Sequence, residues 1–307
     1  MPDSQSVLSG SVVFPASDYG NPDPEWIEID WRKHLHRIEL PGAEVNYAEI
    51  GEGEPILFVH GIAGCWRNWL ENLPHFGRTH RAIALDLPGF GASPMPSWPI
   101  DMPAYGRLIH DFCEKLGIDR VAALVGNSMG GFAATEAAID QPSRFERLVL
   151  VSAAGISFAE ARGREATAFA HTIKAAAIIL LGGHPSVHFL SRPRSRKIGF
   201  GQLVNYPTRL RPELLWEQIE PSIQAPGFAQ AATSIAGYDT RDRLPEIEIP
   251  TMVVWGLRDR IVPVEAAIGY QRLIGGSRLE IFERTGHLPQ MERPERFNRL
   301  LDDFLAD

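Results

Sequence analysis

Residues 121–132 read VAALVGNSMGGF, an apolar run followed by a serine that stands between glycines. A short run of apolar residues without polar breaks is typical of a strand buried on both faces of a sheet. Glycines weaken regular structure, so a cluster of them indicates a backbone that needs the conformations or the clearance that only glycine provides. The stretch therefore predicts a strand that turns sharply at Ser128 and leads into a helix over 132–141.

Apolar runs of the same kind recur on both sides of this stretch, at 55–61, 81–91, 147–155, 249–256 and 278–287. Segments of helical composition lie between or after them, at 66–76, 102–117, 264–274 and 294–307. Strands that alternate with helices form βαβ units, so this pattern predicts a parallel sheet. An antiparallel hairpin is expected over 36–50, because the turn PGA separates two strand-like segments there.

Composition divides the chain into three parts. Residues 1–34 are rich in Ser, Pro, Asp and Gly and predict an irregular extension. The apolar residues expected to anchor its end are Trp26, Ile27, Ile29 and Trp31. Residues 35–155 and 241–307 predict the α/β core, whereas 156–240 lack a clear buried strand and predict an inserted helical cap. The helix-compatible runs of the cap are 158–181 and 212–224.

Charge and cysteine content limit the binding partners and the cellular compartment that we expect. Of 307 residues, 44% are hydrophobic and 22% are charged, and a net charge of −8 disfavours nucleic acid or an anionic membrane as the main partner. The longest apolar run, 175–183, is far shorter than the roughly 20 residues of a membrane span. The N-terminus lacks signal-peptide features, and Cys65 and Cys113 lack metal-site spacing. We therefore expect a soluble cytoplasmic protein, either a monomer or a homodimer.

The serine lies in the motif G-x-S-x-G, formed by Gly126, Asn127, Ser128, Met129 and Gly130. Between a strand and a helix, this motif is a strained turn that lifts the serine hydroxyl clear of the backbone, and the two glycines supply the clearance. The helix N-terminus then favours negative charge that develops beside Ser128. The plainer alternative is a tight turn without chemistry.

A serine hydroxyl needs a base, and the base needs a group that orients it. His287 follows the last strand-like run, and Asp259 follows the one before it. Since the carboxyl ends of parallel strands meet at one edge of a sheet, we expect Ser128, Asp259 and His287 to converge there. Their order along the chain is the Ser, Asp, His order of this motif. The sequence therefore predicts a catalytic triad, with Glu283 as the alternative acid.

Donors for an oxyanion are expected in VHGIAG, residues 59–64, which follow another buried strand. Gly61 lets this loop fold tightly, so the N–H of Ile62 can point at the site beside the N–H of Met129. Losing one such donor typically costs ~3 kcal/mol of transition-state stabilisation. His60 lies in the same loop, and we expect it to brace the turn through hydrogen bonds rather than to act as a base.

Five segments together resemble blocks of the α/β-hydrolase superfamily, over roughly residues 40–307: HGIAG, LDLPGFGAS, GNSMGG, WGLRDRIVP and GHLPQMERP. The resemblance implies an eight-stranded, mostly parallel sheet with a helical cap after the sixth strand, here 156–240. It implies neither a metal nor an organic cofactor. The site residues that it implies are the nucleophile Ser128, the base His287, the third member Asp259 and the oxyanion donors Ile62 and Met129.

The subfamily decides the substrate. A serine nucleophile differs from the aspartate of epoxide hydrolases and haloalkane dehalogenases of this fold. GNSMGG is similar to the meta-cleavage-product hydrolases, which cut carbon–carbon bonds, but those usually carry a tryptophan after the histidine and a Ser-Gly-Pro-Gly oxyanion loop. This chain has Leu288 and Ile62-Ala63-Gly64 instead. We therefore interpret it as a serine carboxylesterase that cleaves esters of apolar acyl or aryl groups through an acyl-enzyme.

Alternatives to this interpretation stay open. One is carbon–carbon hydrolysis of a dienone acid, with a carboxylate held by the cap arginines Arg192, Arg194 and Arg196. Their basic cluster, 191–197, otherwise predicts a solvated loop. Another is a ligand receptor with slow turnover on the same fold, and an acyltransferase or perhydrolase would use the same site. The apolar cap residues 178–181 suit either an apolar acyl group or the cap's own core.

Overall fold

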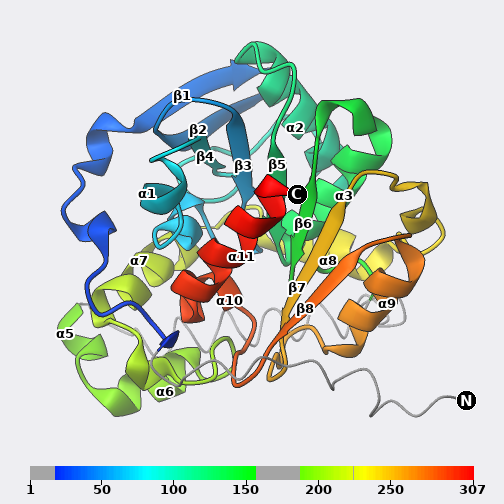
Figure 1. Ribbon diagram of the computed structural model, residues 1–307. Helices are drawn as coiled ribbons and strands as arrows, with labels where there is room; N and C mark the ends of the chain where they lie inside the picture. The colour runs from blue at the N-terminus through cyan, green and yellow to red at the C-terminus, as the bar shows by residue number, and fades with distance from the viewer. Residues whose placement is uncertain (1–17, 157–186, 224) are drawn as a thin grey trace, which may run out of the picture.

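A computed structural model describes residues 18–156, 187–223 and 225–307 of the chain (Figure 1). Within these residues, eight strands form one sheet in the order β1-β2-β4-β3-β5-β6-β7-β8. The strands are β1 (Leu35–Leu40), β2 (Ala43–Ile50), β3 (Pro55–Val59), β4 (Arg81–Leu85), β5 (Ala123–Asn127), β6 (Leu148–Val151), β7 (Thr251–Gly256) and β8 (Arg278–Phe282). The pairs β1–β2 and β2–β4 are antiparallel and the other neighbours are parallel, which confirms the predicted sheet.

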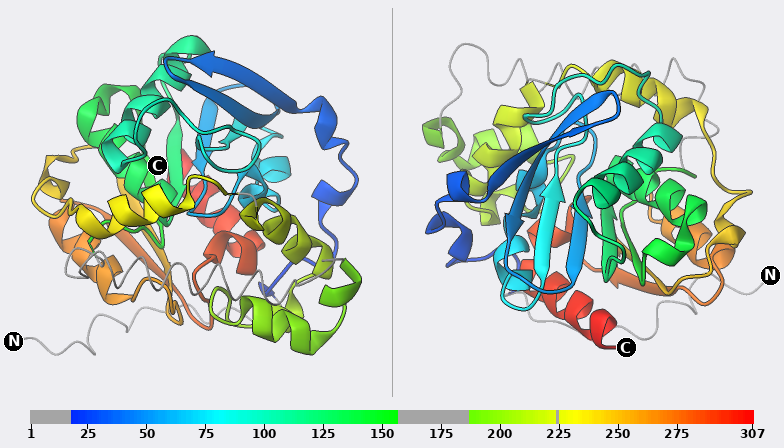
Figure 2. Two further views of the ribbon diagram at one scale, coloured as in Figure 1. Left: turned by 180° about the vertical axis from the view of Figure 1, so that it is seen from behind. Right: turned by 90° about the horizontal axis from the view of Figure 1, so that it is seen from above.

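Helices cover both faces of this sheet. Those that pack directly on it are α1 (Leu73–Phe76), α2 (Met102–Lys115), α3 (Met129–Asp140), α9 (Glu265–Leu273) and α11 (Pro294–Ala306). Successive residues of β3 alternate between two cores: Leu57 and Val59 pack with α2 and α3, whereas Ile56 and Phe58 pack with α1 and α11. Figure 2 shows α11 on the side of the sheet opposite α2 and α3. Burial on both faces explains the nearly all-apolar strands.

Four helices follow β6 within the described part of residues 156–240: α5 (Val187–Leu190), α6 (Pro193–Phe200), α7 (Pro212–Ile223) and α8 (Phe228–Gly237). In Figure 1, α5, α6 and α7 lie at the lower left, and α8 crosses behind the sheet, as the rear view in Figure 2 shows. The run 158–181, including the apolar residues 178–181, lies outside the described residues. The boundaries of core and cap stay predictions.

Two local predictions are wrong. The segment 66–76 is not one helix but a 3₁₀ turn, η5 (Trp66–Trp69), followed by α1. Pro74 has no N–H to continue a helix from the preceding turn, which explains the break. The basic cluster 191–197 is not a loop, because α6 begins in it at Pro193. Proline is favoured at the first position of a helix, and the prediction overlooked this preference.

The N-terminal segment docks on the core through two short 3₁₀ turns, η3 (Glu25–Ile27) and η4 (Trp31–Lys33). Trp26 is buried and donates its Nε1–H to Glu71 Oε1 at 3.0 Å. The ring of Trp31 lies 5.0 Å from that of Trp66. Ile27 is 41% exposed and does not share this burial. Of the expected anchors, Trp26 and Trp31 therefore contact the core, whereas Ile27 is exposed.

Candidate active site

Ser128 lies in the tight turn between β5 and α3. Its backbone has φ +54° and ψ −117°, a conformation that costs a non-glycine residue of order 1–3 kcal/mol. Hydrogen bonds hold it there, since Ser128 N–H donates to Val151 O at 2.9 Å and Ser128 O accepts from Ala154 N–H at 3.0 Å. A Cβ on Gly130 would lie 2.3 Å from Val59 O, and one on Gly126 would lie equally close to Gly130 O. Only glycine fits at both positions.

Asp259 follows β7, His287 follows β8, and their side chains meet. His287 Nδ1 lies 2.8 Å from Asp259 Oδ2, and both side chains are almost fully buried, with 5% and 0% of their surface exposed. The second carboxylate oxygen, Asp259 Oδ1, accepts the N–H groups of Ile261 at 2.8 Å and Val262 at 2.9 Å. These bonds orient the carboxylate toward the imidazole, so the proton resides on Nδ1 and Nε2 can accept one. Glu283, the alternative acid, is exposed.

The histidine loop is also fastened to the residue before the serine. Asn127 Nδ2 donates to His287 O at 3.3 Å and to Val151 O at 3.1 Å. Among the described residues, the Ser128 hydroxyl has no hydrogen-bond partner. Catalytic hydrogen bonds are often long or poorly aligned in an enzyme without ligand and tighten when substrate binds. The side chain of Asn127 therefore links the serine turn to the backbone of the histidine loop.

The loop after β3 passes directly beside the serine. A Cβ on Gly61 would lie 3.1 Å from Ser128 Cβ, and the loop turns through a Gly64 N–H to Gly61 O bond of 3.0 Å. Met129 is the first residue of α3, so its N–H has no acceptor within the helix. Neither this N–H nor that of Ile62 bonds a backbone acceptor in the described part of the chain. Both donors are available to a ligand oxygen.

His60 lies under this loop and is fully buried. Leu87 N–H donates to its Nε2 at 2.9 Å, so the ring proton is on Nδ1, which donates to Gly61 O at 2.7 Å. Burial lowers the pKa of His60 to about 4. Both ring nitrogens are occupied and the ring is neutral near pH 7, which leaves the bracing role as our proposal for it.

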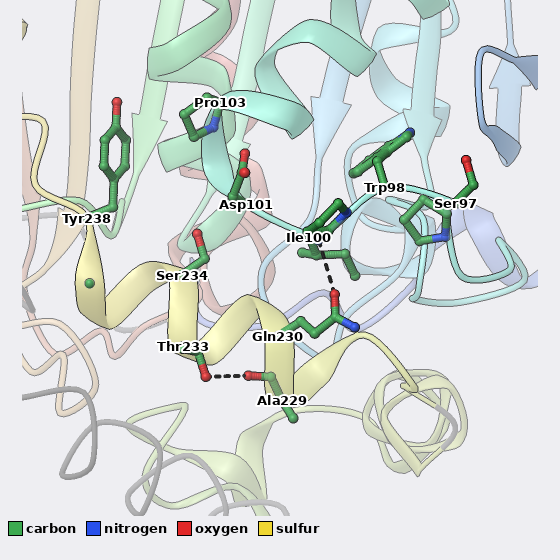
Figure 3. A pocket seen from close by; sticks show the side chains of 13 residues that line it. Ser97, Trp98, Ile100, Asp101, Pro103, Ala229, Gln230, Thr233, Ser234 and Tyr238 are labelled. Atoms are coloured by element: carbon green, nitrogen blue, oxygen red, sulfur yellow. Dashed lines mark hydrogen bonds between the residues drawn. The ribbon is translucent and has the colours of Figure 1, made fainter.

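A cavity of about 900 Å³ opens between residues 96–103 and α8 (Figure 3). Trp98, Ile100 and Tyr238 are among its lining side chains, and Gln230 Oε1 accepts the N–H of Ile100 across it at 3.1 Å. Its lining contains no member of the predicted triad. We therefore do not assign the catalytic chemistry to this cavity.

The cap arginines offer no common site. Arg192 and Arg194 are exposed, and Arg196 donates to Leu210 O at 2.8 Å. Cys65 and Cys113 are both buried free thiols. The described ranges contain no helix long and apolar enough to cross a membrane, and no group of three His, Cys, Asp or Glu side chains placed to hold a metal ion.

Sequence reasoning missed one buried group beside the site. Glu292, in α10 (Pro289–Glu292), has a fully buried carboxylate that contacts the histidine loop. Its position inside GHLPQMERP was part of the resemblance, but its burial depends on segments far away in the chain. The signal in the sequence was an acid that lies close to His287, five residues after it.

Comparison with known proteins places this geometry in a family. Residues 54–294 match the family described as alpha/beta hydrolase fold. The chain is 32% identical over 279 residues to the 2-hydroxy-6-oxo-2,4-heptadienoate hydrolase of Pseudomonas putida. The aligned region covers 86% of this chain and 94% of that protein.

Two solved structures agree with this placement. The meta-cleavage product hydrolase of Pseudomonas fluorescens is 27% identical with a TM-score of 0.70, covering 88% of this chain and 97% of that one. A thermophilic esterase of Thermogutta terrifontis is 26% identical with a TM-score of 0.71, covering 88% and 100%. Fold, serine turn and sequence identity agree: the chain belongs to the α/β-hydrolase fold family.

Proposed function

We propose that this protein hydrolyses the carbon–carbon bond next to the ketone of 2-hydroxy-6-oxo-dienoates. The observation that carries this proposal is the 32% identity to a hydrolase named for such a substrate, over 94% of that hydrolase's length. The esterase interpretation drawn from the sequence has weaker support, because the esterase structure is 26% identical. The proposal thus corrects the order of our two hypotheses.

The first chemical step uses Ser128 and His287. Ser128 Oγ attacks the ketone carbon while His287 Nε2 takes the hydroxyl proton, and the new oxyanion accepts the N–H groups of Ile62 and Met129. Each of these donors is expected to contribute ~3 kcal/mol to transition-state stabilisation. Asp259, 2.8 Å from Nδ1, stabilises the imidazolium that forms.

The second step breaks the carbon–carbon bond, and it needs an electron sink. In the 2-oxo tautomer of the substrate, the electron pair of the C5–C6 bond can move along the conjugated chain to the 2-oxo oxygen. That oxygen then takes the proton from His287, which yields a 2-hydroxydienoate and an acyl group on Ser128. Water, deprotonated by His287, releases the acyl group as a carboxylic acid and restores the serine.

Ester hydrolysis is the second candidate, because one residue beside the base favours it. The residue after His287 is Leu288, which is buried, where carbon–carbon hydrolases of this type usually carry a tryptophan. The same serine, histidine and oxyanion donors would cleave an ester, whose leaving alcohol needs no conjugated sink.

A direct comparison of substrates tests both candidates. The purified protein is assayed with 2-hydroxy-6-oxohepta-2,4-dienoate and with p-nitrophenyl butyrate, and Ser128→Ala serves as the control for each. We expect a much higher kcat/KM for the dienoate, with both activities lost in the control. Strong turnover of the ester with little turnover of the dienoate would overturn the proposal in favour of an esterase. Turnover below one per minute for both would favour the receptor alternative.

A further inference from the structure

The Glu292 carboxylate holds the loop that carries the histidine. Its Oε1 accepts the N–H of Gly286 at 2.8 Å and, at 3.4 Å, that of Leu288. These are the residues on either side of His287, so one buried oxygen fixes the backbone at both sides of the base. The carboxylate has 0% exposure, and nothing in the proposed chemistry uses it.

The other oxygen binds two segments from elsewhere in the chain. Glu292 Oε2 accepts the Tyr19 hydroxyl at 2.6 Å and the N–H of Asn205 at 2.8 Å. The Tyr19 oxygen in turn accepts the N–H of Tyr206 at 2.8 Å. The N-terminal segment, residues 203–206 and the histidine loop therefore meet at a single carboxylate.

Residues 203–206 also contact the histidine loop directly. His287 N–H donates to Leu203 O at 2.7 Å. A Cβ on Gly286 would lie 2.7 Å from that same oxygen, so the two segments pass at backbone distance. A shift of 203–206 would therefore move the backbone of His287.

Residues 18–20 close the junction from outside. Tyr19 is buried, its ring packs edge-on against that of Tyr206 with centroids 5.4 Å apart, and Gly20 N–H donates to Glu292 O at 2.7 Å. The Arg293 guanidinium lies 5.2 Å from the centre of the Tyr19 ring.

Arg293 is the charged residue beside the Tyr19 ring. It pairs with Asp18 and donates its Nε–H to Thr285 Oγ1 at 3.0 Å. Burial raises the pKa of Glu292 to about 7, and the surrounding donors act against that rise. Burying this acid costs desolvation energy, and four hydrogen-bond donors offset that cost. Such a carboxylate can hold the segments that carry its donors in fixed positions.

We propose that Tyr19 and Glu292 are positioning residues for His287, so that the N-terminal segment completes the active site from outside the α/β core. The proposal rests on the role of His287 as base, but not on which bond the enzyme cleaves. Without the Tyr19 hydroxyl, both Glu292 Oε2 and the Tyr206 N–H lose a buried partner. The junction then relaxes, and misplacing a catalytic group by about 1 Å costs ~10²-fold in rate.

The test is Tyr19→Phe, which keeps the ring and removes only the hydroxyl. We expect kcat to fall roughly 10- to 100-fold with little change in KM, because the base is displaced while the substrate pocket is kept. The pH profile of kcat/KM, which reports the essential ionisations of the free enzyme, should also change. Glu292→Gln should change the same quantities in the same direction.

Tyr238→Phe is the matched control. The Tyr238 hydroxyl donates to another buried carboxylate, Glu136, at 3.1 Å, and this pair does not touch the histidine loop. Thermal unfolding of both variants should report similar small losses, so that a kinetic difference is not a difference in folding. Equal kcat and equal pH profiles in Tyr19→Phe and Tyr238→Phe would overturn the proposal.

A reaction that needs no substrate separates this proposal from the proposed function. Ser128 is labelled with a fluorophosphonate. The serine oxygen attacks the phosphorus and fluoride leaves, and this attack also requires the imidazole to take the serine proton. We expect slower labelling in Tyr19→Phe than in Tyr238→Phe. That result stands even if the dienoate is not a substrate, whereas equal labelling rates would contradict the positioning role even if dienoate turnover is high.

Discussion

The site contains two buried histidines whose surroundings differ. His60 follows β3 and His287 follows β8, so each stands just past the carboxyl end of a parallel strand. The ring of His60 faces a carbonyl oxygen and an amide, Gly61 O at 2.7 Å and Leu87 N–H at 2.9 Å. The ring of His287 faces a carboxylate, Asp259 Oδ2, at 2.8 Å.

This difference shows how the partner of a ring nitrogen decides what a buried histidine can do. With uncharged partners, burial lowers the pKa of His60 to about 4, so the ring stays neutral near pH 7, which suits the proposed bracing role. A carboxylate partner supports a cation instead, which a general base must become during the reaction. Position at a strand end is thus common to both residues, and only the second one has the partner that a base needs.

The largest effect is expected from Asp259→Asn, which removes that partner. The oxygen of the new side chain would keep the bonds from Ile261 and Val262, and its NH₂ group would then face His287 Nδ1. This forces the proton onto Nε2, where it blocks acceptance from Ser128. We expect kcat to fall by up to ~10⁴, as in the chymotrypsin-type case.

The matched control for this variant is Glu283→Gln. Glu283 belongs to the same loop as the histidine, but it is exposed, so its loss should change kcat little. A near-silent Asp259→Asn together with a large effect of Glu283→Gln would show that another acid supports the base.

Much of this comparison could be predicted from the sequence. Strand ends in a parallel sheet are fixed by short apolar runs, so His60, Ser128, Asp259 and His287 could all be placed at one edge before any coordinates. The same runs predict the parallel strands, and the eight-stranded sheet that the resemblance implies is confirmed. The preference for a bracing role at His60 came from its place in a glycine-rich loop, and this assignment, like the triad, stays a prediction.

Other features could not be predicted, because they depend on contacts between distant segments. Tyr19 meets Glu292 across 273 positions, and no local pattern announces such a pair. The single helix expected over 66–76 is wrong for a local reason, because Pro74 has no N–H to continue it. Substrate choice is the hardest case, since two local departures, Leu288 and the loop Ile62-Ala63-Gly64, led the interpretation toward esters.

A smaller effect is expected from His60→Phe, which keeps a ring but removes both hydrogen bonds. The N–H of Leu87 is then left buried without an acceptor, and an unsatisfied buried group costs about 1–3 kcal/mol. We expect the free energy of unfolding in urea to fall by that amount, and kcat to fall much less than in Asp259→Asn. A loss of kcat as large as that of Asp259→Asn would contradict the proposed difference between a bracing His60 and a catalytic His287.

The smallest effect is the acid dependence of stability that His60 contributes. Because its pKa in the folded protein, about 4, lies below the ordinary value of 6.5, its stabilisation is complete above pH 6.5 and is lost as pH falls toward 4. Between pH 7.5 and 5.5 this loss amounts to about 1 kcal/mol. Raised carboxyl pKa values, about 6 for Asp86 and about 7 for Glu292, act in the opposite direction, so the total pH dependence does not isolate it.

The difference between two proteins does isolate this contribution. Urea unfolding of the unchanged protein and of His60→Phe at both pH values lets the carboxyl contributions cancel, because the two proteins share them. The unchanged protein should lose about 1 kcal/mol more than the variant on going to pH 5.5. An equal loss in both proteins would mean that His60 takes up a proton as readily in the folded protein as in the unfolded chain, and the contrast with His287 would then have no electrostatic basis.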